Sequence, residues 1–395
     1  MTKDALWALV ALAVSFQPAT AADQGCMEIA PDADALAAPV VDTSVTAGRS
    51  AACLPGAANG RGDVALGTRD ANGRPDMGWT VKPPGGGASL GRFFGPNVTT
   101  LLPQEDGWIG GSEWGFELMS PPEIYGWSST GDLLHESRLP ANRIAPDFTS
   151  GAVVAFGTED PPWQVLVQRF GSGAAPRSGP VLVARVSYPV AVGVDTDRDA
   201  LVLFDGSAAG LPADHLGGRW FDPCGAALTE VFDTGVARPL GTSSGTLAPL
   251  YDGSLALQLD GQWVARFAPR STDLAGPAPA WLAAQPDTRL VWIRQGKGYA
   301  LIPKAGDVAE CRQQILLYTK AGQSCGGVTF TVDGLPCTTS EINVGPDGTV
   351  VQLSPRNLCL DPTCSSFRCS YSWWPGLLGG HGHAGGGVRP APRCR

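Results

Sequence analysis

The feature that most constrains this chain is a series of short apolar runs separated by turn-forming residues. Each run is about four to eight residues long and rich in β-branched or aromatic side chains, which is typical of β-strands. The runs include Gly151–Gly157, Trp163–Phe170, Val181–Val186, Pro189–Val194, Ala200–Phe204, Leu255–Leu259, Gln262–Phe267, Arg289–Arg294, Tyr299–Ile302, Ile315–Thr319 and Val328–Val332. No window shows the 3.6-residue period of an amphipathic helix. The sequence therefore predicts an all-β fold.

Composition supports a folded β protein and excludes several classes. The 395 residues include 52 Gly and 34 Pro, enough for the many turns that short strands need. Hydrophobic residues are 43% and charged residues 16%, a balance that excludes a disordered chain. The net charge is −9 and no cluster of Lys and Arg is visible, so we expect no nucleic-acid partner.

Three segments share a turn glycine followed by a small polar residue and a strand. They are Thr130–Leu134, Asp252–Ala256 and Asp347–Val351, each with the glycine at its second place. The glycines lie 122 and 95 residues apart, which divides into about three and two units of roughly 41 to 48 residues. That length is typical of one blade of a β-propeller.

With this spacing, the chain resembles the β-propeller repeat proteins in the broad sense, the NHL, PQQ-like and WD-type families. The resemblance covers about residues 61–358 and implies a propeller of six or seven blades. It further implies that Gly131, Gly253 and Gly348 lie on one face of a ring, and that the cores between blades hold Leu133, Leu255 and Val350. The alternative is a β-sandwich or a pair of β domains.

The two ends of the chain differ from this middle part. Lys3 precedes an apolar run over residues 6–16, and Ala19-Thr20-Ala21 forms an A-x-A cleavage site, so residues 1–21 are predicted to be a signal peptide. We expect a secreted, periplasmic or cell-surface protein that is not integral to a membrane, because no later apolar run approaches 18 residues. Residues 22–60 form an N-terminal segment, and residues 359–395 form a Cys-rich, Gly/Pro-rich tail.

Ten cysteines after an export signal predict disulfides. Local spacing favours Cys26–Cys53 and Cys325–Cys337, and Cys224 is expected to reach a distant partner. A zinc site is the alternative for Cys359, Cys364 and Cys369 with His381 and His383. Their C-x4-C-x4-C spacing lacks the C-x2-C pair of most structural zinc sites.

Catalytic motifs are weak, and we name no catalytic residue. The Gly241–Gly245 segment matches G-x-S-x-G around Ser243, but turn signals follow it where the nucleophile elbow requires a helix. His135 and His215 are possible bases, although a structural role is expected for both. Possible channel carboxylates of a carbohydrate-active hydrolase or lyase are Asp106, Glu113, Glu123 and Glu159.

Besides the zinc alternative in the tail, a metal is considered at one other place. Asp195, Asp197 and Asp199 form D-x-D-x-D, which can wrap calcium, but Ala200 and Gly206 occupy the places where an EF-hand loop needs Gly and Glu. We therefore expect no cofactor and keep calcium as the alternative to a polar hairpin turn.

Tryptophans are spread through the β region and could fill cores or form platforms for sugars. They are Trp79, Trp108, Trp114, Trp127, Trp163, Trp220, Trp263, Trp281 and Trp292. The preferred hypothesis is a secreted non-enzymatic protein that binds a macromolecule or glycan through propeller loops. A carbohydrate-active enzyme and a structural envelope protein are the alternatives. An aromatic-lined mouth favours binding, whereas paired carboxylates about 5 to 10 Å apart in a channel favour an enzyme.

Overall fold

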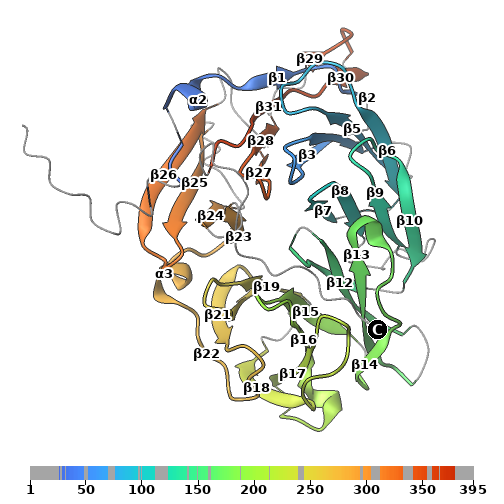
Figure 1. Cartoon of the computed structure of the whole chain (residues 1–395), viewed down its shortest axis with the longest axis vertical. Coiled ribbons are helices and arrows are strands. Elements are labelled where there is room, and N and C mark those ends of the chain that lie inside the picture. Colours follow the sequence, from blue (N-terminus) through green and yellow to red (C-terminus); the bar gives the residue numbers. More distant parts are fainter. Residues whose placement is uncertain are drawn as a thin grey trace, which may run out of the picture.

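The computed structural model shows a seven-bladed β-propeller (Figure 1). Each blade is a four-stranded antiparallel sheet, and the seven blades surround a central axis. This confirms the all-β propeller and sets the number of blades at seven. The structure describes residues 26, 29–31, 33–48, 52–69, 76–96, 98, 100–111, 123–139, 142–148, 150–158, 162–186, 188–212, 214–238, 244–293, 297–303, 312–331, 341–353, 358–363 and 365–378.

The blades are numbered here in chain order, each from its innermost strand outward. Blade 1 comprises β3 (Ala52–Ala58), β4 (Val64–Arg69), β5 (Asp76–Lys82) and β6 (Gly91–Pro96). Blade 2 comprises β7 (Thr100–Gln104), β8 (Gly107–Gly111), β9 (Glu123–Trp127) and β10 (Leu133–Arg138). Blade 3 comprises β11 (Asn142–Pro146), β12 (Gly151–Gly157), β13 (Val165–Gly171) and β14 (Val181–Ala184). Blades 4 and 5 comprise β15 (Pro189–Val194), β16 (Ala200–Asp205), β17 (His215–Phe221) and β18 (Phe232–Ala237); and β19 (Gly245–Pro249), β20 (Leu255–Leu259), β21 (Gln262–Phe267) and β22 (Gly276–Pro277). Blade 6 comprises β23 (Thr288–Ile293), β24 (Gly298–Pro303), β25 (Arg312–Thr319) and β26 (Ser324–Thr331).

Blade 7 closes the ring with strands from both ends of the chain. Its order is β27 (Glu341–Val344), β28 (Val350–Leu353), β31 (Tyr371–Trp374) and β1 (Val40–Asp42). The outermost strand therefore precedes blade 1 in sequence, and it pairs antiparallel with β31. Joining the first and last parts of the chain in one sheet leaves the ring no free end.

This closure corrects the expected domain limits of 61–358. The segment 22–60 contributes β1 and β3 to blades, and the segment 359–395 contributes β31. A short helix, α2 (Ala33–Ala37), precedes β1, and a small sheet of β2 (Thr46–Gly48), β30 (Ser366–Arg368) and β29 (Leu358–Cys359) lies beside blades 7 and 1.

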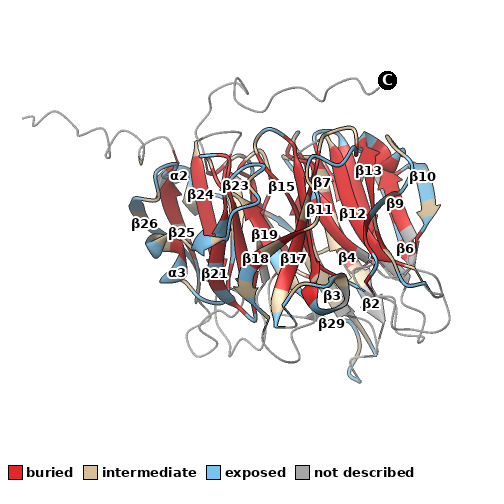
Figure 2. Cartoon of the chain, turned by 90° about the horizontal axis from the view of Figure 1, so that it is seen from below, coloured by how far each residue is buried: buried red, intermediate tan, exposed pale blue. Residues whose placement is uncertain are grey.

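Seven clusters of buried apolar side chains form the core, and each lies between two adjacent blades. Leu255, for example, packs between blades 4 and 5, and Val350 packs between blades 6 and 7. Figure 2 shows the same pattern, with buried residues along the strands and exposed ones on outer strands such as β10. Strands buried on both faces explain why the sequence shows continuous apolar runs.

The turn glycines follow one backbone pattern that recurs around the ring. In the turns 128–132, 250–254 and 345–349, the first residue's N–H donates to the fifth residue's carbonyl, and the fourth residue's N–H donates to the first residue's carbonyl. Gly131, Gly253 and Gly348 occupy the fourth place with φ of 87°, 87° and 85°, where a side chain would be strained. All three turns lie at the same face of the ring, because strands alternate in direction. We call this the turn face.

The three turns are nevertheless not equivalent. Gly253 and Gly348 join the first and second strands of their blades, whereas Gly131 joins the third and fourth strands of blade 2. Leu133 therefore begins the outermost strand and is 54% exposed, not packed between blades as expected. The 122-residue separation spans two and a half blades and the 95-residue separation spans two, so blades average close to 48 residues.

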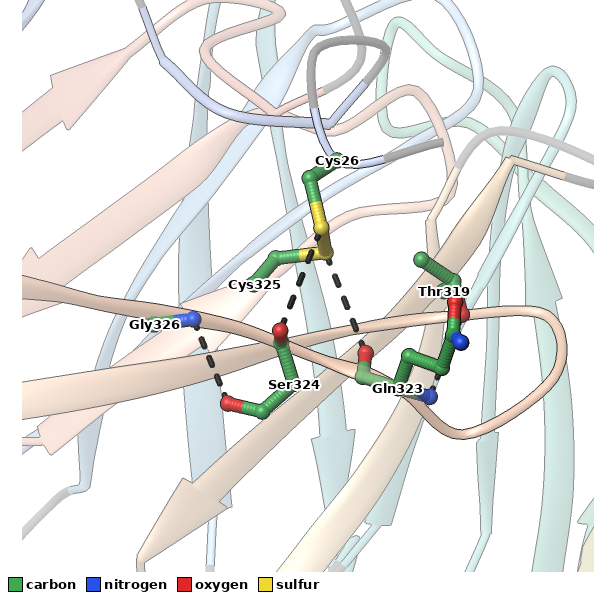
Figure 3. The surroundings of a disulfide bond; sticks show 6 residues. All are labelled: Cys26, Thr319, Gln323, Ser324, Cys325 and Gly326. Atoms are coloured by element: carbon green, nitrogen blue, oxygen red, sulfur yellow. Dashed lines mark hydrogen bonds between the residues drawn. A yellow bond between two sulfur atoms is a disulfide. The ribbon is translucent and has the colours of Figure 1, made fainter. Parts of the chain in front are cut away.

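Two disulfides tie the ends of the chain to the ring, and they contradict both expected pairs. Cys26 bonds to Cys325 across 299 residues (Figure 3), and Cys53 bonds to Cys369 across 316 residues. Local spacing failed as a guide because ring closure brings residues from opposite ends of the chain together. Such bonds are compatible with an extracellular location.

The zinc alternative is also wrong. Cys359 and Cys369 are both disulfide-bonded, so neither has a free thiolate for a metal. Cys224 is disulfide-bonded as well, while Cys337, Cys364, His381 and His383 lie outside the described residues. Among the helices that the structure describes, none is long and apolar enough to cross a membrane.

Candidate aromatic site at the turn face

A continuous set of aromatic rings lies at the turn face over blades 5 and 6. We call it the aromatic cluster, and its members are Phe148, Tyr251, Trp281, Trp292, Tyr299 and Tyr318. Tyr251 stands in the turn between β19 and β20, and Trp292 is near the end of the innermost strand β23. Trp281 comes from α3 (Ala280–Ala283), which connects the two blades.

Hydrogen bonds hold the partly exposed rings in place. The Trp292 indole N–H donates to the Pro249 carbonyl at 2.8 Å, and the Tyr251 hydroxyl donates to the Gly298 carbonyl at 3.1 Å. The Tyr251 and Trp292 rings stack at a centroid distance of 4.0 Å. Both ring systems are therefore fixed before any ligand arrives, which lowers the entropy cost of binding.

Phe148 extends this surface across the axis of the ring. It belongs to the turn between β11 and β12 of blade 3, and its ring meets the Trp292 ring of blade 6 edge-on at 5.3 Å. Blades 3 and 6 lie on opposite sides of the seven-bladed ring, so the contact crosses the central axis of the ring (Figure 1). Phe148, Tyr251, Trp281 and Trp292 are all partly exposed.

Charged side chains lie near the cluster, and the carboxylates among them contact arginines instead of one another. Asp252 receives a hydrogen bond from Arg266 Nη2 at 2.5 Å, and Lys320 lies with its ammonium 5.8 Å from the Tyr251 ring centroid. Asp106, one of the expected channel carboxylates, forms an ion pair with Arg61 at 3.1 Å. The aromatic cluster thus lies beside the exposed Lys320 and the arginine-bound Asp252.

The turn that carries Phe148 is anchored by a buried charge cluster between blades 3 and 4. Arg198 of blade 4 donates to both oxygens of Asp147, from Nε at 2.9 Å and from Nη2 at 2.6 Å. Arg169 and Arg177 place further guanidinium nitrogens 3.7 Å from Asp147 Oδ2. Burial lowers the pKa of Arg169 to about 10, although the charges of Asp147 and Asp199 act to raise it. Asp147 therefore sits in a strongly cationic surrounding.

Replacing Arg198 with Met is expected to lower the free energy of unfolding by about 3 kcal/mol, because Asp147 keeps a buried charge without its two-point partner. Guanidinium denaturation would measure the loss. Arg177→Met is the matched control, since its guanidinium is 23% exposed and farther from Asp147. Equal losses of unfolding free energy for the two variants would show that the bidentate contact between Arg198 and Asp147 stabilises the fold no more than the contact of Arg177.

The other residues predicted from sequence do not join this cluster. Asp106 lies at the turn face, whereas Glu123 begins a third strand and so lies at the opposite face. Glu113, Glu159 and Ser243 lie outside the described residues. His135 contacts Ser137 Oγ at 3.0 Å on the outermost strand β10, and His215 Nδ1 contacts the Asp233 carboxylate at 3.0 Å on blade 4. The described histidines are therefore separated from the aromatic cluster and from each other.

The D-x-D-x-D segment forms the turn between β15 and β16. Asp195 Oδ1 accepts hydrogen bonds from the N–H groups of Asp197 and Asp199, both at 2.9 Å, and Asp199 pairs with Arg270. Among the residues that the structure describes, no three His, Cys, Asp or Glu side chains gather into a metal-binding group. In the structure, this segment is a polar hairpin turn.

Sequence reasoning found part of the aromatic site. Trp79, Trp108, Trp127, Trp220 and Trp263 are buried core residues, as expected for most tryptophans. Trp281 and Trp292 were named among the possible platforms, but Phe148, Tyr251 and Lys320 were not. The sequence does mark Phe148 and Tyr251, because Asp147-Phe148 and Tyr251-Asp252 each place an aromatic residue next to Asp in the first turn of a blade.

Comparisons with known proteins return weak structural likenesses only. No protein-family model matches the chain, and no curated protein matches it. Prolyl oligopeptidase B from Galerina marginata shares 11% identity, with 82% of this chain and 52% of that chain covered and a TM-score of 0.46. The acylaminoacyl peptidase of Pyrococcus horikoshii shares 11%, with 83% and 52% covered and a TM-score of 0.46. The periplasmic gluconolactonase of Pseudomonas aeruginosa shares 14%, with 66% and 80% covered and a TM-score of 0.38.

This chain spans about half the length of the two peptidases. The assignment of a seven-bladed propeller rests on the sheet topology, and function has to be inferred from the aromatic cluster and its surroundings.

Proposed function

We propose that this chain is an exported, non-enzymatic binding protein that holds a saccharide against the aromatic cluster at the turn-face mouth. The stacked, partly exposed pair Tyr251 and Trp292 carries the proposal. Faces of sugar rings present C–H groups that pack on aromatic faces, while the phenol and indole polar atoms face hydrogen-bond partners. Phe148 extends the aromatic surface across the axis of the ring, which suits a ligand larger than one sugar ring.

Two observations favour binding over hydrolysis. The carboxylates of Asp252 and Asp106 are each bonded to an arginine, and Asp252 also accepts from the N–H and hydroxyl of Ser254, so these two are not free to act as an acid and base pair. The aromatic rings are already held in position by Pro249 and Gly298, so the surface is suited to recognise a rigid ligand. An oxidising location outside the cytosol would supply both the disulfides and access to extracellular glycans.

Trp292→Ala is expected to weaken saccharide binding by at least about 10-fold, because buried aromatic anchors dominate binding energy. Calorimetric titration of a panel of soluble glucan, mannan and pectin-derived oligosaccharides would measure this. Trp163→Ala is the matched control, since Trp163 is 54% exposed and precedes β13, at the opposite face. Equal weakening by both variants would contradict a site at the turn face, as would no binding of any panel member by the wild type.

A further inference from the structure

Asp195 and Asp199 occupy opposite positions across the turn between β15 and β16, and both side chains are buried. Asp195 and Asp199 are the first and fifth residues of this turn, and the Asp195 N–H donates to the Asp199 carbonyl at 2.9 Å. Residues directly opposite in a hairpin have Cβ atoms about 5 Å apart on the same side. Both residues are completely buried, with 0% exposure.

Each carboxylate has one oxygen that lacks a donor. Asp195 Oδ1 accepts the two turn N–H groups, and Asp199 Oδ2 accepts from Arg270 Nε. Asp195 Oδ2 and Asp199 Oδ1 are buried without a hydrogen-bond partner. Buried acceptors are rarely left without a donor, because their desolvation is then uncompensated.

We propose that Asp195 and Asp199 share one proton, with the Asp195 carboxyl donating to the Asp199 carboxylate, and that this hydrogen bond makes the junction of blades 3, 4 and 5 sensitive to pH. A single proton satisfies both unpaired oxygens at once. It also removes the repulsion between two like charges in a buried site.

The surrounding charges decide which residue carries the proton. Arg270 bonds Asp199 directly and also lies near Asp195, and the Arg169 charge acts on Asp199. Asp199 is thereby kept as the carboxylate, and Asp195, whose bonds come from backbone N–H groups, takes the proton. The charged groups that act on the pair are Asp197 from the same turn, Arg270 after β21 and Arg169 from β13. Arg169 in turn is influenced by the charges of Asp147, Arg198 and Asp222.

The titration of Asp195 agrees with this placement. Burial raises the pKa of its carboxyl to about 7, the charges of Asp199 and Asp197 act in the same direction, and the two turn N–H groups oppose them. A pKa raised in the folded state means that the proton stabilises the fold. This contribution is complete below about pH 3.8, the ordinary value, and is lost as the pH rises through about 7.

Asp195→Asn tests the proposal, because an amide donates like the protonated acid at every pH. The melting temperature of the variant minus that of the wild type is expected to rise by about 3 °C between about pH 5 and pH 8. Asp197→Asn is the matched control, because Asp197 lies exposed in the same turn and its charge is the smallest of the influences on Asp195, so the difference for this variant should change much less over the same pH range. A difference for Asp195→Asn that does not change with pH would overturn the proposal.

A second measurement does not depend on any variant folding. Carbon-13 NMR of the aspartate side chains in the wild type should show one carboxyl that titrates near pH 7 and is missing in Asp195→Asn. Adding calcium distinguishes a shared proton from a bound cation. If millimolar CaCl₂ raised the melting temperature of the wild type at about pH 8 and not that of Asp195→Asn, the pair would hold a metal. That result would refute the shared proton. No effect of calcium, together with the titrating carboxyl, supports the shared proton.

Discussion

Replacing Leu255 with Asp is expected to unfold the propeller, whereas the same change at Leu133 is expected to be nearly neutral. The two leucines follow similar turns, Asp252-Gly253-Ser254 and Thr130-Gly131-Asp132. Leu255 has 0% exposure between blades 4 and 5, so aspartate there buries a charge with no partner and costs more than about 4 kcal/mol.

Leu133 is 54% exposed on the outermost strand of blade 2, where substitutions change stability by about 0.5 kcal/mol or less. Circular dichroism and guanidinium denaturation of both variants would measure the contrast. A folded Leu255→Asp with wild-type stability would contradict the packing of blades described here.

Removing the Cys53–Cys369 disulfide by replacing both cysteines with Ala is expected to lower the free energy of unfolding by about 4 kcal/mol. The bond encloses most of the chain, but Cys26–Cys325 already shortens the path between the two cysteines in the unfolded state. Denaturation with and without the bond would measure the loss.

The same variant should loosen the closure of the ring. Cys369 lies two residues before β31, and residues Tyr371–Trp373 of that strand pair with β1. Amide hydrogen exchange over Val40–Asp42 should therefore accelerate more in this variant than in one that lacks only Cys26–Cys325, because Cys26 is bonded to blade 6. Equal exchange in both variants would show that the Cys53–Cys369 bond does not secure the closing strand.

Local patterns in the sequence predicted much of this fold. Apolar runs such as Ala200–Phe204 are inner strands of the blades, because a strand that is buried on both faces needs a continuous apolar sequence. Turn glycines marked real hairpins, since Gly253 and Gly348 adopt positive φ that other residues avoid. The blade length predicted from the sequence was too short at its lower end. Turns between the first and second strands and turns between the third and fourth strands share one backbone pattern, and they alternate at intervals of half a blade.

Contacts between distant residues could not be predicted from one sequence. Cys26 meets Cys325, and Trp373 donates its indole N–H to the Pro84 carbonyl at 2.7 Å, only because the ring closes. The aromatic cluster has the same origin: Phe148 and Trp292 are 144 positions apart and meet across the axis. Spacing rules describe neighbours along the chain, so they located the turns and missed the site that the turns assemble.

Saccharide recognition at the turn-face mouth is tested most directly by NMR of the tryptophan indole N–H groups during oligosaccharide titration. The Trp292, Trp281 and Trp163 signals can be assigned from single Phe substitutions. Binding at the aromatic cluster predicts that the Trp292 and Trp281 signals move together and saturate, while the Trp163 signal stays in place. Movement confined to Trp163, or no movement of Trp292 with a saccharide that calorimetry shows to bind, would contradict it.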